Sequence, residues 1–180
     1  MIFNDTPLPG VFLIEPERLQ DERGFFARTF CAETFAAQGL VGQLVQCSIS
    51  SNPAYGTLRG MHFQRQPYCE TRLVRCTMGA IFDVVIDLRP QSPTYCEWTA
   101  AELTADNRLA MYIPEGCAHG FLTLAENSEV FYQMSEFYHA EVAAGVRWND
   151  PAFAIKWQFQ PDIMSSRDAA YPDYVKLPPV

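Results

Sequence analysis

Short segments with the composition of β-strands recur along the chain at intervals of roughly 8–12 residues, a spacing typical of all-β sandwiches and barrels. Turn-forming sequences such as NPAYG (52–56) and TADN (104–107) separate several of these segments. We therefore predict an all-β fold whose first strand is VFLIEP (11–16). The other predicted strands cover residues 24–30, 45–51, 57–64, 72–77, 81–88, 96–102, 110–114, 120–124 and 130–137.

Helical signals are few. CAETFAAQGL (31–40) has helical composition and a stop at Gly39, which predicts a short surface helix. HAEVAAG (139–145) predicts one helical turn. The tail from residue 148 to 180 is predicted to be mostly irregular because prolines recur along it. The length of 180 residues fits a single domain spanning residues 1–180.

The charge balance limits the classes of partner. The chain carries 13 Lys and Arg against 21 Asp and Glu, a formal net charge of −8, whereas nucleic-acid binding needs a basic surface. The N-terminus lacks the basic and apolar regions of a signal peptide, and no apolar stretch approaches the ~20 residues of a membrane helix. We therefore expect a cytoplasmic protein that binds neither nucleic acid nor membrane and keeps its six cysteines as free thiols.

The stretch GTLRGMHFQRQP (56–67) carries unusual residues for a barrel strand. Alternation places Leu58, Gly60, His62 and Gln64 on one face and the residues between them, beginning with Arg59, on the other. Neither face is purely apolar. A lone strand histidine is more often structural than catalytic. Nearby arginines favour a functional reading here, since Arg59 lies three residues upstream and position 72 can point into the same lumen.

The strand IFDVVIDL (81–88) places two carboxylates, Asp83 and Asp87, on one face of a strongly apolar segment. The simpler interpretation is that this face meets solvent. If both faces are enclosed, Asp83 must have a hydrogen-bonding partner.

Two further side chains have both a structural and a functional interpretation. Tyr132 shares an apolar, inward-facing side of its strand, so it is either a core tyrosine or a general acid in a cavity. Asp168 lies in the irregular tail, where it is a surface residue unless the tail folds back to His62. A carboxylate that holds a histidine fixes its tautomer and raises its basicity.

The histidine content argues against a metal site. The chain has three histidines and no H-x-H pair, and His139 lies in a polar loop where it is expected to be solvated. Transition-metal sites usually need two or three imidazoles, so we predict a site without metal.

The ordered set of motifs resembles the dTDP-4-dehydrorhamnose 3,5-epimerase family. The resemblance runs from the N-terminus to about residue 170. It rests on the segments DERGFF (21–26), GTLRGMHFQ (56–64), RLVRCTMGAIFDVVIDLR (72–89), SPT (92–94), PEGCAHGF (114–121), VFYQMSEFY (130–138), GVRWNDP (145–151) and SSRD (165–168).

This resemblance implies a cupin-type jelly-roll β-barrel with short peripheral helices. It implies a homodimer with an N-terminal strand shared across the interface, and a reaction that needs neither metal nor organic cofactor. The implied substrate is a nucleotide-diphosphate 4-keto-6-deoxy sugar, which is epimerised at C3 and C5 through an enolate.

The resemblance also assigns roles to residues. His62 is the base, Asp168 pairs with it, and Tyr132 returns a proton to the opposite face of the sugar. Arg72 stands where the family commonly has the lysine that stabilises the enolate. The implied substrate-binding residues are Arg23, Phe26, Arg28, Gln46, Ser50, Arg59, His119, Tyr138 and Arg167.

Several alternatives stay open at this point. Arg28 replaces a common glutamate near the nucleotide base, so CDP or GDP could take the place of dTDP. The enzyme could invert C3 alone, or it could be a 3,4-ketoisomerase on the same kind of barrel. The chain could also be a sugar-binding protein without activity, although the set of His62, Tyr132 and Asp168 argues against this.

Overall fold

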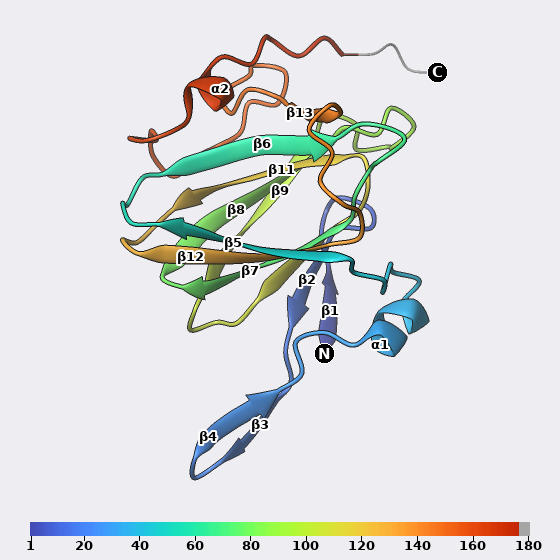
Figure 1. The fold of residues 1–180 in the computed structure, drawn as a ribbon, viewed down its shortest axis with the longest axis vertical. Coiled ribbons are helices and arrows are strands. Elements are labelled where there is room, and N and C mark those ends of the chain that lie inside the picture. The colour runs from blue at the N-terminus through green and yellow to red at the C-terminus, as the bar shows by residue number, and fades with distance from the viewer. Residues whose placement is uncertain (177–180) are drawn as a thin grey trace.

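The computed structural model describes residues 1–176, which form two antiparallel sheets and a separate hairpin (Figure 1). The six-stranded sheet has the order β1-β2-β10-β7-β12-β5, and the five-stranded sheet has the order β13-β6-β11-β8-β9. The strands are β1 (Ile2–Asp5), β2 (Phe12–Glu15), β3 (Arg18–Asp21), β4 (Gly24–Ala27), β5 (Gln46–Asn52), β6 (Leu58–Gln64), β7 (Arg72–Met78), β8 (Ala80–Asp87), β9 (Trp98–Thr104), β10 (Ala110–Ile113), β11 (Cys117–Thr123), β12 (Ser128–Met134) and β13 (Ala143–Gly145). The helices are α1 (Ala32–Ala37) and α2 (Ser166–Ala169).

A core of inward-facing side chains holds the two sheets together. Val74 and Val130 from the six-stranded sheet pack with Ile81, Val85 and Phe121 from the five-stranded sheet, and all five are buried. Alternation along each strand supplies these residues, because every second side chain points to the same face. The prediction of an all-β fold with short helices is therefore confirmed.

The outer face of the five-stranded sheet is covered by the C-terminal tail. Val84 and Ile86 of β8 pack there with Phe153 and with partly buried tail residues such as Trp157. Strand β8 is thus enclosed on both faces. The simpler interpretation of 81–88, with a solvent-facing carboxylate row, is wrong, since Asp83 and Asp87 are both fully buried.

Three predictions about local structure need correction. The first strand is β1 and not residues 11–16, because residues 2–5 pair antiparallel with β2. The segment 143–145 forms strand β13 on the edge of β6, where backbone pairing replaces the predicted helical turn. The tail is mostly irregular as predicted but contains α2, whose N-terminus is capped by the Ser165 hydroxyl. Residues 177–180 lie outside the described part of this tail.

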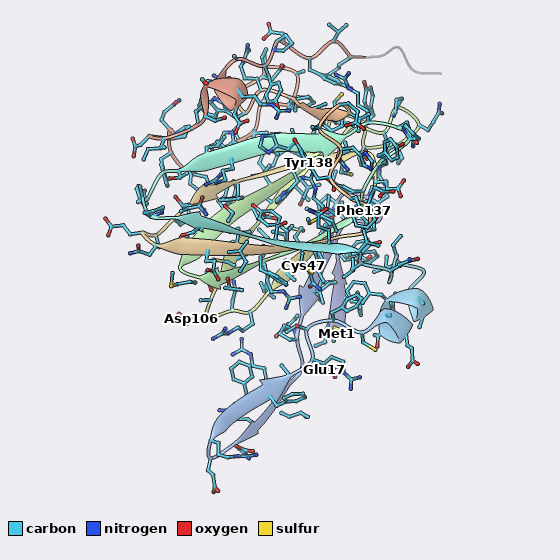
Figure 2. The ribbon with its side chains drawn as sticks, viewed as in Figure 1. Met1, Glu17, Cys47, Asp106, Phe137 and Tyr138 are labelled. Atoms are coloured by element: carbon cyan, nitrogen blue, oxygen red, sulfur yellow. The ribbon has the colours of Figure 1, made fainter. Side chains whose placement is uncertain are left out.

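The β3–β4 hairpin projects away from both sheets (Figure 1). Its base is fixed by Arg18, whose guanidinium donates to the carbonyl oxygens of Asp106 and Asn107 and lies over the Phe25 ring. Met1 pairs with Glu17 just before the hairpin (Figure 2). The hairpin is therefore held in a defined direction although it makes no pairing with either sheet.

Gly60→Ala tests how closely β6 and β11 approach. A Cβ at Gly60 would lie 2.5 Å from the Gly120 Cα, and Gly60 has φ +138. Gly39→Ala is the matched control, since Gly39 also has a positive φ of +71 but open space around it. We expect Gly60→Ala to lower the free energy of unfolding, measured by urea denaturation, by about 1–3 kcal/mol more than the control. Equal losses would contradict the steric argument.

Candidate active site

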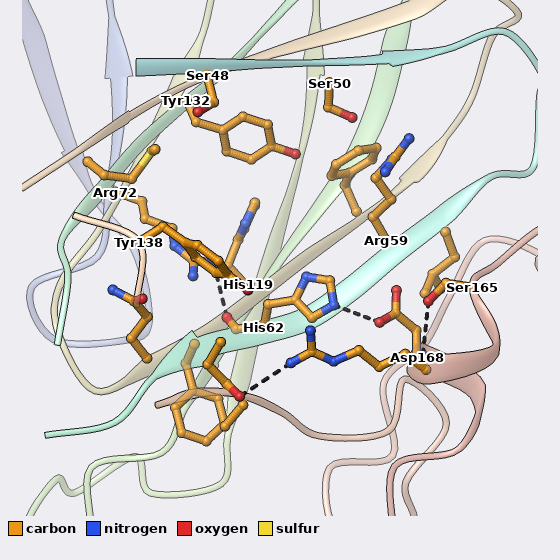
Figure 3. A pocket seen from close by; sticks show the side chains of 18 of the residues that line it. Ser48, Ser50, Arg59, His62, Arg72, His119, Tyr132, Tyr138, Ser165 and Asp168 are labelled. Carbon is orange, nitrogen blue, oxygen red and sulfur yellow. Dashed lines mark hydrogen bonds and ion pairs between the residues drawn. The ribbon is translucent and has the colours of Figure 1, made fainter. Parts of the chain in front are cut away.

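A cavity of about 840 Å³ is lined by side chains of both sheets and the C-terminal tail (Figure 3). Strands β6 and β11 contribute from the five-stranded sheet, and β5, β7 and β12 from the six-stranded sheet. Residues 163–168 of the tail form a further part of the wall. Such a concave space with a few polar groups is where a small molecule binds most readily.

His62 and Asp168 are in direct contact in this cavity. The imidazole Nε2 lies 2.7 Å from Asp168 Oδ1, and 39% of the His62 side chain is exposed against 6% of Asp168. The Gly60 N–H donates to Asp168 Oδ2 at 3.3 Å, while the Asp168 N–H donates to the Ser165 hydroxyl. The tail therefore does fold back to the β6 histidine.

The pKa of Asp168 is lowered from its ordinary value. Burial alone would raise this pKa, but hydrogen bonds from His62, the charge of its imidazolium form and the Gly60 N–H outweigh the burial. The carboxylate is thus charged at neutral pH. It holds the imidazole by one nitrogen and leaves the other nitrogen free for chemistry.

A register shift between β6 and β11 brings Arg59 into the same cavity as His62. His119 pairs with His62, but Phe121 pairs with Arg59, so the two β6 residues between these pairs oppose a single residue of β11. The strict alternation used in the sequence analysis placed the two side chains on opposite faces, and that prediction is wrong. The Arg59 Nε donates to Asn52 Oδ1 at 2.7 Å.

Tyr132 reaches the cavity from the sheet opposite His62 (Figure 3). Burial raises the pKa of its phenol strongly, and the charge of Asp83 raises it further. The positive charges of Arg72 and Arg59 act in the other direction without overcoming the burial. Tyr132 is therefore a neutral phenol at physiological pH and has a proton to donate.

One carboxylate oxygen of the buried Asp83 has a partner, whereas Oδ2 has no hydrogen bond within the described residues. The His119 Nε2 lies 2.7 Å from Asp83 Oδ1, and both side chains are almost fully buried. The His119 ring also lies 6.2 Å from the Tyr132 ring, centroid to centroid, in an edge-to-face arrangement. This pair therefore places a second imidazole next to the Tyr132 ring.

Arg72 lies beside His62 in the cavity wall, as its strand alternation predicts. Its Nη1 donates to the His62 carbonyl oxygen at 3.1 Å, and its Nε donates to Glu70 Oε1 at 2.9 Å. Glu70 was not identified from the sequence. The available signal was a carboxylate two residues before the arginine, a spacing common on exposed strands.

A match to a protein-family model shows which family the chain belongs to. The model described as dTDP-4-dehydrorhamnose 3,5-epimerase matches residues 5–176. The chain belongs to this family.

Individual members of the dTDP-4-dehydrorhamnose 3,5-epimerase family agree with this assignment. The member from Methanothermobacter thermautotrophicus is 45% identical over 158 residues, covering 88% of this chain and 84% of the relative. The crystal structure of the enzyme from Elizabethkingia anophelis matches with a TM-score of 0.92 at 36% identity, covering 97% of this chain and 96% of that chain. The predicted cupin-type jelly roll is confirmed by this likeness, as is the class of isomerases.

A solved structure of a monoepimerase also matches. The structure of a 3'-monoepimerase from Streptomyces bikiniensis in complex with dTDP-quinovose gives a TM-score of 0.86 at 29% identity. It covers 93% of this chain and 85% of that chain.

The residues that the epimerase resemblance assigned to substrate binding fall into two groups. The first group lines the cavity, namely Gln46, Ser50, Arg59, His119, Tyr138 and Arg167. The second group is not part of the cavity lining of its own chain, namely Arg23, Phe26 and Arg28. These three lie on or next to the hairpin that projects away from both sheets.

The described residues contain neither a cluster of metal-binding side chains nor a helix able to span a membrane. Within residues 1–176, no three His, Cys, Asp or Glu side chains are grouped so that they could hold a metal ion. None of the helices in this range has the length and apolar character needed to span a membrane.

Asp168→Asn tests the lowered pKa of the tail carboxylate. Because the folded-state pKa is depressed, the charged form stabilises the fold above the unfolded-state pKa of about 3.9, and this contribution is lost as pH falls through the folded-state pKa. We expect the free energy of unfolding of the variant to be about 1–3 kcal/mol lower than that of the wild type at pH 7. This difference should shrink steadily below about pH 4. Urea titrations at several pH values measure this. The exposed Asp5→Asn variant is the control, and a difference that does not depend on pH would contradict the prediction.

Proposed function

We propose that this protein epimerises a dTDP-linked 4-keto-6-deoxy sugar at C3 and C5 through an enolate. One observation carries the proposal. An imidazole held by a carboxylate and a neutral phenol face one cavity from opposite sheets. Inversion of a carbon needs proton removal on one face and proton delivery on the other, which this pair can supply.

His62 would remove the proton from the carbon next to the C4 ketone. Asp168 contacts one ring nitrogen, so the other nitrogen carries the lone pair that accepts the proton. The nearby carboxylate stabilises the imidazolium that results. The partial exposure of His62 leaves it open to the bound sugar.

Tyr132 would then protonate the enolate from the other side. Its raised pKa keeps the proton on the phenol until a carbanion equivalent is formed. A group with a pKa this far above neutral cannot act as the base at physiological pH, so the environment fixes which of the two side chains is the acid.

Positive charge around the cavity fits the remaining parts of the substrate. Arg72 would stabilise the developing negative charge on the C4 oxygen, while Arg59 and Arg167 would bind the diphosphate. Guanidinium groups suit phosphate oxygens because they donate two parallel hydrogen bonds.

We further propose that the protein is a homodimer in which the β3–β4 hairpin enters the partner's cavity. Leu19 and Phe26 form a cross-strand pair on this hairpin and are each 70% exposed, which is unusual for large apolar side chains. Arg23 and Arg28 would reach the nucleotide of the neighbouring site. Each site would then be complete only in the dimer, and we propose that residues 1–180 act within it as one domain.

Two alternatives differ in product. A 3-epimerase is favoured by the similar 3'-monoepimerase and by arginine in place of the lysine at position 72. A 3,4-ketoisomerase would move the carbonyl group instead of inverting a carbon, and NMR of the product distinguishes it.

Deuterium exchange tests the reaction. Incubation with dTDP-4-keto-6-deoxyglucose in heavy water is expected to place deuterium at both C3 and C5. His62→Ala should reduce this exchange by about 10²–10⁴-fold. Tyr132→Phe should slow inversion by about 100-fold while exchange persists, because His62 can return a deuteron to the same face.

The outcomes separate the candidates. Exchange at C3 alone would indicate a 3-epimerase. Turnover unchanged in both variants would contradict the proposal and indicate that these side chains have no catalytic role. No exchange with dTDP-, CDP- or GDP-linked 4-keto sugars would exclude the whole class.

Subunit mixing tests the shared site. Homodimers of Arg23→Ala and of His62→Ala are each expected to have less than about a tenth of the wild-type activity. After denaturation and refolding together, heterodimers would contain one site with an intact His62 and an intact partner Arg23. Activity should then recover well above that of either variant. No recovery, with the two variants carrying different affinity tags and heterodimers purified on both tags in succession, would contradict hairpin exchange.

A further inference from the structure

Glu70 is a buried carboxylate in the cavity for which the proposed reaction has no use. Only 8% of its side chain is exposed, and it lies just before strand β7. Its Oε1 accepts hydrogen bonds from both the Nε and the Nη2 of Arg72. A buried carboxylate costs free energy unless it is paired, so Arg72 explains how Glu70 is tolerated. The pairing also has consequences for the arginine.

The contacts of Arg72 fix the direction of its guanidinium group. Of its five N–H groups, two bind Glu70 and one on Nη1 binds the carbonyl oxygen of His62. Two N–H groups remain, one on each terminal nitrogen. Because the group is planar and held at three points, these two donors have a set direction relative to the backbone of His62.

Glu70 is itself fixed by strand β6. Gln64 Nε2 lies 3.4 Å from Glu70 Oε2 and also donates to the carbonyl oxygens of Tyr68 and Phe137. Gln64 and His62 lie two residues apart on the same strand. The contacts therefore form a closed loop that runs from His62 through Arg72, Glu70 and Gln64 back to β6.

We propose that Glu70 is a positioning residue that directs the free N–H groups of Arg72 at the ketone oxygen of the substrate. This inference rests on the proposed epimerase function. The loop couples the Arg72 guanidinium to His62. The enolate oxygen therefore meets Arg72 at the same time as the abstracted proton meets His62. The negative charge of Glu70 also offsets the positive charge of Arg72. The arginine therefore acts through directed hydrogen bonds more than through net charge.

The pairing makes arginine and lysine unequal at position 72. A lysine ammonium is a compact charge on a flexible stem, and the Glu70 carboxylate would draw it away from the substrate. An arginine can bind the carboxylate by one edge and still present donors on the other. Glutamate at 70 and arginine at 72 therefore work as a pair.

A double-mutant cycle tests this with Glu70→Gln, Arg72→Lys and the double variant. Glu70→Gln keeps the shape and the acceptor oxygen but removes the charge. We expect it to lower kcat by about 10-fold with less than about a 3-fold change in KM. Arg72→Lys should lose about 100-fold in kcat, and the double variant should recover part of that loss because the lysine is no longer held by the carboxylate. Glu141→Gln, an exposed glutamate outside the cavity, controls for the change in net charge and should match the wild type.

Two results would overturn the proposal. One is a Glu70→Gln variant with wild-type kcat and KM. The other is a cycle in which the two losses simply add. An inactive wild type would instead remove the proposed function, and with it this role, so the two failures can be told apart.

A measurement without substrate provides a second check. NMR should show the Arg72 Nε–H exchanging with solvent more slowly than the Nε–H of exposed arginines, and Glu70→Gln should accelerate it about 10-fold or more. Exchange as fast as that of exposed arginines in the wild-type protein would contradict the pairing.

Discussion

The proposed catalytic site depends on one packing contact, the C-terminal tail lying across the outer face of the five-stranded sheet. Phe153 and its apolar neighbours bury the outer side of β8 there, and Thr57 bridges to Ile163 beside β6. This packing places α2 against β6, where Asp168 contacts both His62 and the backbone of Gly60. A buried carboxylate without these hydrogen bonds would cost several kcal/mol, so the tail and the site stabilise each other.

In the proposed reaction, the same enclosure separates the roles of acid and base. His62 lies at the open side of the cavity, next to a charged carboxylate, while the phenol of Tyr132 is buried near Asp83. Burial and a nearby negative charge both favour the neutral phenol. Two groups that could each move a proton are thereby assigned opposite tasks by their surroundings, with no change in their intrinsic chemistry.

Much of this could be read from the sequence. Alternating apolar residues gave nearly all the strands of the two sheets, because a half-buried strand needs apolar side chains at every second position. The position of Arg72 in the lumen followed from the same rule. The rule failed at Arg59, because a register shift between two strands is a property of their pairing and leaves no periodic signal in either one. Strand β13 was missed for a related reason, since its short Ala-rich segment is extended only because β6 offers an unpaired edge.

The contacts of Glu70 and Asp168 could not be predicted from the local sequence. Each is an isolated carboxylate in a stretch that reads as a turn or loop, and only the resemblance to a family drew attention to Asp168. The order of residues was enough to predict the all-β class, most of the strand faces and the small set of side chains capable of proton transfer. The tertiary structure alone decided which of them meet, because contacts between residues more than 100 positions apart depend on how sheets and tail pack and not on any local pattern.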